Sequence, residues 1–229
     1  MSTIDYKNNI KCAVFDLDGT LLNTIKTIEY YLNLALLKNG LGSIDETACM
    51  SFVGDGAAML IHRALGSLGA DNRENFERVF RDYNEAYDQN PYYLTEPYSG
   101  ITEVISYLGS RGIKMAVLSN KPDFATKAAV RYFFGDSFDL VLGGRENTPL
   151  KPSPDALFYI MSELSVTLDE VLYVGDSEVD VMTAKNAGIG NALFVTYGFR
   201  SRDQLVEAGA VLLSDDTLGI IEYIKTVRP

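Results

Sequence analysis

Short apolar runs that recur along the chain predict β-strands. Each run ends in small or polar residues, and none shows the alternation of a strand with one wet face, which is typical of strands buried on both faces. The runs are residues 12–15, 114–118, 140–142, 171–174, 192–195 and 210–213.

The segments between the later runs predict helices that alternate with these strands. Apolar residues recur at helical spacing within 101–108, 156–164 and 181–184, and Gly188 is a plausible stop for the last of these helices. Continuous apolar strands alternating with helices indicate a parallel sheet covered on both faces. We therefore predict an α/β fold with a doubly wound, Rossmann-like parallel sheet.

One interval, residues 21–93, interrupts this alternation. It has a helix-like pattern without a convincing strand, with amphipathic faces within 28–36, 57–68 and 76–87. A helical block after the first strand predicts an inserted all-α domain, and prolines at 91 and 97 mark its exit. The predicted domains are a core of residues 1–20 and 94–229 and a cap of residues 21–93.

Composition and charge narrow the classes of partner. The chain has 229 residues, 47% of them hydrophobic and 22% charged, which is ordinary for a globular protein. A formal net charge of −11 argues against nucleic acid or an anionic membrane as the main partner, because both require a basic surface. A small anionic substrate is compatible with this charge where a local cation neutralises the site. We predict no nucleic-acid and no membrane partner, and a monomer or homodimer.

Cysteine and histidine usage excludes further classes. Two cysteines, Cys12 and Cys49, are too few for a disulfide framework, and Cys12 lies in an apolar run as a predicted buried thiol. The polar N-terminus lacks a signal-peptide pattern, which predicts a cytoplasmic location. His62 is the single histidine, so histidine triads and zinc clusters are disfavoured.

Polar side chains follow the predicted strands at the point where each strand ends. In an open parallel sheet, ligands bind beyond the carboxyl ends of the strands. We therefore expect one edge of the sheet to bring together four carboxylates, a hydroxyl, an amide and an ammonium, from Asp16, Asp18, Ser119, Asn120, Lys151, Asp176 and Asp180.

Four neighbouring carboxylates require a cation. Two unit charges 4 Å apart repel by about 4 kcal/mol at an effective dielectric constant of 20. A hard divalent ion with oxygen ligands removes this repulsion, and Mg²⁺ is the usual choice where phosphate is also present. Lys151 and Ser119 supply donors suited to phosphoryl oxygens, which predicts phosphoryl transfer from a small phosphorylated metabolite.

The pair Asp16 and Asp18 divides the chemistry between two carboxylates. Asp16, at the strand end, is placed to attack phosphorus as the nucleophile. Asp18 is placed to protonate the leaving oxygen and then to take a proton from the water that hydrolyses the aspartyl phosphate. Gly19 and Thr20 permit a tight turn whose backbone N–H groups face the phosphate.

Four segments resemble the signatures of the haloacid dehalogenase superfamily of phosphatases, in order and at family spacing. They are VFDLDGTLLNT at 14–24, VLSN at 117–120, LKPSPD at 150–155 and VGDSEVD at 174–180. The resemblance implies a Rossmann-like core with a helical cap. It also implies Mg²⁺ held by the Asp16 carboxylate, the backbone carbonyl of Asp18 and Asp176, with support from Asp180, and Ser119 as a phosphate ligand. Asn23 stands where many relatives carry aspartate.

Within that superfamily, residues 52–65 (FVGDGAAMLIHRAL) resemble the cap segment of phosphoglycolate phosphatases. Gly54 and Gly56 precede a predicted helix, so backbone amides there could face an anion such as the glycolate carboxylate. Related caps also occur on pyrophosphatases and on phosphatases of sugar phosphates or nucleotides.

Other functions remain open at this point. A sugar-phosphate mutase of the same superfamily would form the same aspartyl phosphate and pass the phosphoryl group on. A non-catalytic phospho-accepting or interaction protein would not need a general acid at Asp18, and neither would a dehalogenase.

Overall fold

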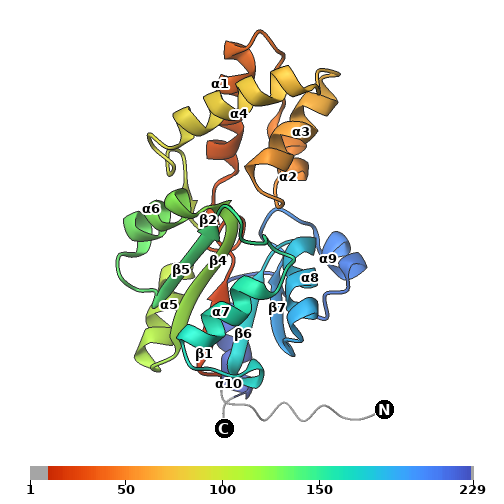
Figure 1. The fold of residues 1–229 in the computed structure, drawn as a ribbon. Helices are drawn as coiled ribbons and strands as arrows, with labels where there is room; N and C mark the ends of the chain where they lie inside the picture. The colour runs from red at the N-terminus through yellow and green to blue at the C-terminus, as the bar shows by residue number, and fades with distance from the viewer. Residues whose placement is uncertain (1–9, 228–229) are drawn as a thin grey trace.

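A six-stranded parallel sheet forms the centre of the molecule (Figure 1). The computed structural model describes residues 10–227. In spatial order the strands are β5 (Leu140–Gly144), β4 (Lys114–Pro122), β1 (Cys12–Phe15), β6 (Val171–Gly175), β7 (Asn191–Val195) and β8 (Leu212–Ser214). The α/β fold class predicted from the sequence is confirmed.

Helices cover both faces of this sheet. One hydrophobic cluster joins the sheet to α5 (Ile101–Ser110), α6 (Asp123–Phe134) and α10 (Leu218–Val227). A second cluster joins the opposite face to α7 (Asp155–Glu163), α8 (Glu178–Ala187) and α9 (Arg202–Ala208). Every residue of β1 and β6 is buried, because side chains on both faces of these central strands pack under helices. Cys12 is a buried free thiol, as predicted.

Local sequence sets several helix boundaries. A reciprocal pair of hydrogen bonds between Ser177 and Asp180 caps the start of α8, which satisfies backbone N–H groups that the helix leaves free. Gly188, with φ of 76°, ends α8 in the left-handed region, so the predicted stop is confirmed.

Two strand boundaries differ from the predicted ranges. β8 begins two residues later than predicted, at Leu212, and β4 continues past residue 118 to Pro122.

Four further helices pack together around their own hydrophobic cluster, beyond the carboxyl ends of the strands (Figure 1). They are α1 (Ile25–Lys38), α2 (Glu46–Phe52), α3 (Ala57–Ser67) and α4 (Arg73–Tyr87), and we call them the helical block. The expectation that residues 21–93 contain no strand is wrong. The two-residue strand β2 (Leu22–Asn23) pairs antiparallel with β3 (Glu96–Pro97), so the two chain segments that join the block to the sheet are hydrogen-bonded to each other.

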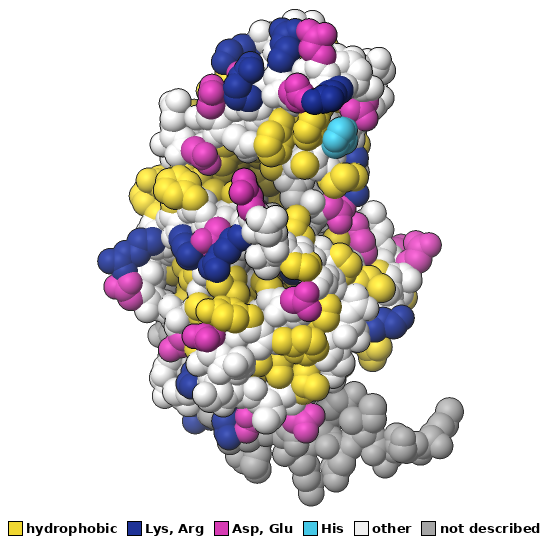
Figure 2. All heavy atoms as spheres, viewed as in Figure 1, with side chains coloured by type: hydrophobic (Ala, Val, Ile, Leu, Met, Phe, Trp, Pro, Cys, Tyr) yellow, Lys and Arg dark blue, Asp and Glu magenta, His cyan; other side chains and the backbone are white. Residues whose placement is uncertain are grey.

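The sheet order places β1 between β4 and β6. The chain therefore leaves β1 at the switch point of the sheet, where parallel α/β folds bind ligands. On the face drawn in Figure 2, Lys and Arg side chains are interspersed with Asp and Glu. Among the described residues, the longest apolar helices fall short of what is needed to span a membrane.

Candidate active site

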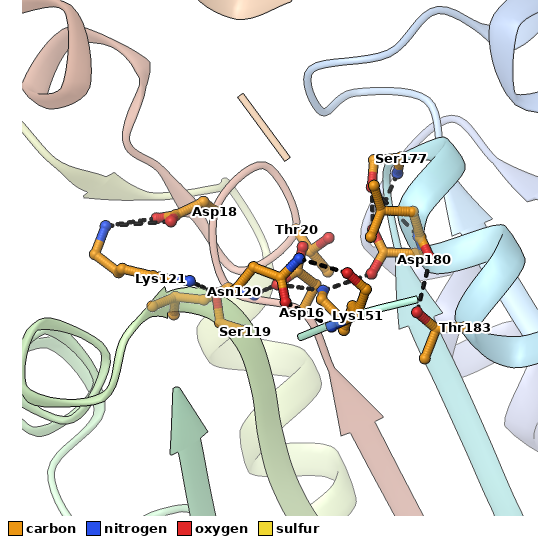
Figure 3. A network of polar contacts seen from close by, with 12 residues as sticks. Asp16, Asp18, Thr20, Ser119, Asn120, Lys121, Lys151, Ser177, Asp180 and Thr183 are labelled. Carbon is orange, nitrogen blue, oxygen red and sulfur yellow. Dashed lines mark hydrogen bonds and ion pairs between the residues drawn. The ribbon is translucent and has the colours of Figure 1, made fainter. Parts of the chain in front are cut away.

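Asp16 follows the last residue of β1 and lies in the middle of the site (Figure 3). Its carboxylate accepts a hydrogen bond from the backbone N–H of Leu17 at 2.7 Å. Gly19 follows in a tight turn with φ of 89°, and a Cβ at this position would collide with the Asp176 carboxylate. The turn therefore requires glycine both for its backbone conformation and for its close approach to Asp176.

Lys151 neutralises two buried carboxylates. Its Nζ lies 2.9 Å from Asp16 Oδ1 and 2.7 Å from Asp180 Oδ1, and its side chain is 2% exposed. The Asn120 side chain holds the Lys151 backbone, because its Oδ1 accepts from Lys151 N–H at 2.8 Å and its Nδ2 donates to Lys151 C=O at 2.9 Å. Asn120, from the second motif, thus fixes the position of Lys151, from the third.

Burial and charge set the ionisation of this group. Burial raises the pKa of Asp16 to about 7, against the opposing effect of the Lys151 charge. Burial by itself lowers the pKa of Lys151, but Asp16 and Asp180 outweigh burial and hold that pKa well above its usual value. Lys151 therefore stays a cation at the centre of the site.

Both carboxylate oxygens of Asp180 accept hydrogen bonds. Burial by itself raises its pKa, but Lys151 and hydrogen bonds from Ser177 and Tyr173 outweigh burial and bring the pKa below its usual value. Oδ1 accepts from Tyr173 Oη at 2.9 Å, and Oδ2 accepts from Ser177 Oγ at 2.6 Å and from the backbone N–H groups of Asp176 and Ser177. This ionised carboxylate is held in place at the start of α8.

Asp176 lacks such neutralisation. It is 1% exposed, and its carboxylate accepts from Thr20 Oγ1 at 2.9 Å and from Phe199 N–H at 2.8 Å, both neutral donors. Burial, with Asp180 and Asp16 nearby, raises the pKa of Asp176 well above its usual value. The Thr20 side chain is thus directed at Asp176, a contact that sequence reasoning did not anticipate.

Asp16, Asp176 and Asp180 form a buried acidic cluster. One carboxylate oxygen from each lies within 4.8 Å of the other two. A hard cation with oxygen ligands fits this donor set, because it would neutralise Asp176, which no ammonium or guanidinium reaches among the contacts of the described residues.

The Asp18 side chain is turned away from this cluster (Figure 3). Lys121 Nζ donates to both Asp18 carboxylate oxygens, at 2.9 and 3.2 Å, and to Tyr87 Oη at 2.6 Å. Tyr87 is the last residue of α4, so the helical block contacts the general-acid candidate through one lysine. The backbone carbonyl of Asp18, which the resemblance assigns to the metal, does not depend on this side-chain orientation.

A cavity of about 740 Å³, part of it open to solvent, lies between the helical block and the acidic cluster. Asp16, Asp18, Ser119, Asn120, Lys151 and Asp176 line its sheet side. Gly54 and Gly56 line the opposite side, and Asn120 Nδ2 donates to Gly54 C=O at 2.9 Å. The structure therefore places the loop that contains Gly54 and Gly56 next to the polar side chains at the carboxyl edge of the sheet.

Sequence reasoning missed three groups in this cavity: Lys121, Tyr87 and Arg200. Lys121 comes two residues after Ser119, so a longer reading of the strand end would have found it. Tyr87 is the last residue of the amphipathic face predicted within 76–87, a pattern that indicates packing between helices. Arg200 follows β7 by five residues without a motif, and its guanidinium donates to Met50 C=O and Val53 C=O, both at 2.7 Å.

The sequence profile of the haloacid dehalogenase-like hydrolases matches residues 13–194. The chain belongs to this family. It is therefore an enzyme of the hydrolase class, and the resemblance carried by its four motifs is confirmed.

Individual members of the family support this assignment. The phosphoglycolate phosphatase of Pseudomonas fluorescens is 33% identical over 215 residues, which are 92% of this chain and 78% of that protein. The phosphoglycolate phosphatase of Rhodospirillum rubrum is 32% identical over 96% of this chain and 92% of that protein. A crystal structure from Lactobacillus delbrueckii subsp. bulgaricus, 30% identical, superposes with a TM-score of 0.89 over 94% of this chain and 98% of that one.

Proposed function

We propose that this hydrolase is a Mg²⁺-dependent phosphatase that cleaves a small phosphomonoester, with 2-phosphoglycolate as the expected substrate. The observation that carries the proposal is the buried Asp16 carboxylate, which lies 2.9 Å from Lys151 Nζ, inside an acidic cluster and at the base of a cavity. The nucleophile candidate Asp16 lies beside the Lys151 ammonium, and the buried Asp176 carboxylate requires a second cation. Two positive charges beside a nucleophile suit the negative charge of a phosphoryl group. We choose 2-phosphoglycolate because two relatives that are 33% and 32% identical to this chain are phosphoglycolate phosphatases.

The first half-reaction transfers the phosphoryl group to Asp16. Lys151, from the loop between β5 and α7, and Ser119, from β4, would bind phosphoryl oxygens and hold phosphorus in line with the Asp16 carboxylate. Asp18 would then give its proton to the leaving alcohol oxygen as the P–O bond breaks and the aspartyl phosphate forms. Asp16, Asp176 and the Asp18 carbonyl would hold the Mg²⁺, which supplies Lewis-acid neutralisation of the phosphoryl charge when bound.

The second half-reaction restores the enzyme. Asp18 would take a proton from water, the water oxygen would bond to phosphorus, and the Asp16–phosphorus bond would break. Inorganic phosphate leaves and Asp16 is again a carboxylate. Asp18 has to turn from Lys121 toward Asp16 for both proton transfers, because its carboxylate now lies against Lys121 Nζ.

The helical block would act as a cap that closes over the site and excludes water. We place the cap at residues 21–93 and the catalytic core at 1–20 and 94–229. The paired strands β2 and β3 span this boundary, which makes them the candidate hinge.

Phosphate release is expected with Mg²⁺ and is expected to fall to background when EDTA removes the ion, because Asp176 then stays uncompensated. The assay compares 2-phosphoglycolate, pyrophosphate, sugar phosphates and nucleotides, and Mg²⁺ added back in excess is the control. Preference for 2-phosphoglycolate supports the full proposal. Full activity in EDTA contradicts the metal requirement, and a preferred sugar phosphate or pyrophosphate contradicts the expected substrate.

Asp18→Asn is expected to slow hydrolysis of an alkyl phosphate by about 10²–10³-fold, since the variant has no proton to give or take. The backbone carbonyl remains, so metal binding should persist. With p-nitrophenyl phosphate, whose leaving group needs no proton, the first step should be spared and aspartyl phosphate should accumulate. Wild-type rates on the alkyl phosphate would exclude Asp18 as the general acid.

A further inference from the structure

The Lys121 ammonium is a buried charge that faces the cavity. Its side chain is 4% exposed, and its acceptors are the Asp18 carboxylate and the Tyr87 hydroxyl. It comes from the end of β4, beside the phosphate-binding candidate Ser119. A buried ammonium requires an anionic partner at every stage of turnover, because leaving a buried charge unpaired is strongly unfavourable.

The other two cationic side chains that line the cavity, within the part of the chain that the structure describes, already have hydrogen-bond and ion-pair partners. Lys151 is bound by Asp16 and Asp180. Arg200 is bound by Glu178 and by two backbone carbonyls of the helical block. Among the described residues that line the cavity, those of the helical block include no lysine or arginine, and Asp88 adds a negative charge. An anionic group on the leaving alcohol therefore finds its cation on the core side, at Lys121.

We infer that Lys121 determines specificity by exchanging Asp18 for a carboxylate on the leaving group. This inference rests on the proposed phosphatase function and deepens it, because it names the residue that selects phosphomonoesters of α-hydroxy acids, the class to which 2-phosphoglycolate belongs.

The exchange follows from the contacts of Asp18. Asp18 has to release Lys121 when it turns to the leaving oxygen, which leaves Nζ without its anion. In a phosphorylated α-hydroxy acid, one carbon separates the ester oxygen from the carboxylate, so the carboxylate arrives beside the position that Asp18 vacates. The substrate itself then supplies the anion, and a neutral leaving group does not.

Tyr87 offers a second donor to the same carboxylate. Its hydroxyl oxygen accepts from Lys121 Nζ, so its own O–H remains available to donate. Burial raises the pKa of Tyr87 well above its usual value, which keeps the proton on oxygen. Because Tyr87 belongs to α4, this contact would make closure of the cap depend on the leaving group.

The test compares kcat/KM for 2-phosphoglycolate with kcat/KM for 2-hydroxyethyl phosphate, in which a neutral hydroxymethyl group replaces the carboxylate. The variants are Lys121→Met, which keeps the length of the side chain and removes its charge, Lys121→Arg and Tyr87→Phe. Lys127→Met, on the exposed face of α6 outside the cavity, is the matched control.

The wild-type enzyme is expected to prefer 2-phosphoglycolate. In Lys121→Met, the ratio of the two kcat/KM values should fall about 30-fold, the size of a charged hydrogen bond, mainly through KM. Lys121→Arg should restore most of the ratio, Tyr87→Phe should lower it about fivefold, and Lys127→Met should leave it unchanged. Loss of Asp18 positioning alone would slow both substrates equally and leave the ratio unchanged.

An unchanged ratio in Lys121→Met and in Tyr87→Phe overturns the inference. So does a wild-type phosphatase that hydrolyses both substrates equally well, although the proposed chemistry then stands. Absence of phosphate release from every substrate overturns the proposed function itself, and the inference with it. Should Lys121→Met fail to fold, the ratios of Lys121→Arg and Tyr87→Phe against wild type decide the question.

Discussion

Asp16→Asn is expected to lower phosphate release by about 10⁴-fold or more, because an amide cannot form the aspartyl phosphate on which turnover depends. The substitution keeps the shape of the side chain. Burial already raises the Asp16 pKa to about 7, so the protein gains little stability from the charge, and the variant should fold. Steady-state assays with circular dichroism on the same preparations measure both effects.

The control for this variant is Asp136→Asn, at an exposed ion pair with Arg131 near the end of α6 and outside the cavity. It should keep near-wild-type turnover, because a surface pair of this kind contributes about 0–1 kcal/mol. Turnover by Asp16→Asn within tenfold of wild type would contradict the assignment of the nucleophile.

Lys151→Met is expected to lower activity by about 10³-fold and to destabilise the fold by about 3 kcal/mol. The variant leaves Asp16 and Asp180 buried without the ammonium that lies 2.9 and 2.7 Å from them. Two like charges would then share one low-dielectric site, and the phosphoryl group would lose a cation. Urea denaturation and phosphate-release assays measure the two losses separately.

A second substitution distinguishes charge imbalance from lost packing. Asp180→Asn added to Lys151→Met removes one of the uncompensated charges, so it should recover part of the lost stability without recovering activity. Lys127→Met, at an exposed ion pair, is expected to change neither quantity. Wild-type stability in Lys151→Met would show that Lys151 does not neutralise the buried carboxylates.

The central strands and the overall topology could be predicted because burial on both faces leaves a strong sequence signal. β1, with four buried residues in sequence, matches its predicted range, and β6 exceeds its range by one residue. Helices α5, α7 and α8 followed from apolar spacing, and Gly188 marked the end of α8.

Elements with weak local signals could not be predicted. β2 and β3 have two residues each, and they exist because chain segments 73 residues apart meet (23 to 96). α2 and α9 have seven residues each, too few for a helical period to appear. Tertiary packing, rather than local pattern, specifies these elements.

The site was predictable as far as strand ends specify position. Strand order alone brings Asp16, Ser119 and Asp176 to one edge, since β4, β1 and β6 are neighbours. Side-chain direction was not predictable, because packing against the helical block decides it. Asp18 turns to Lys121, and Lys121 meets Tyr87 from a helix 34 residues earlier in the chain.

The most direct test of the central claim is to trap the covalent intermediate on Asp16. The enzyme turns over excess 2-phosphoglycolate with Mg²⁺, is quenched in acid and is treated with borohydride, which reduces an acyl phosphate to an alcohol. Peptide mass spectrometry then locates the reduced residue. We predict homoserine at position 16 in the wild-type enzyme, and none in Asp16→Asn or without substrate. Phosphate release at the wild-type rate with an unmodified Asp16 under these conditions would contradict the proposed mechanism.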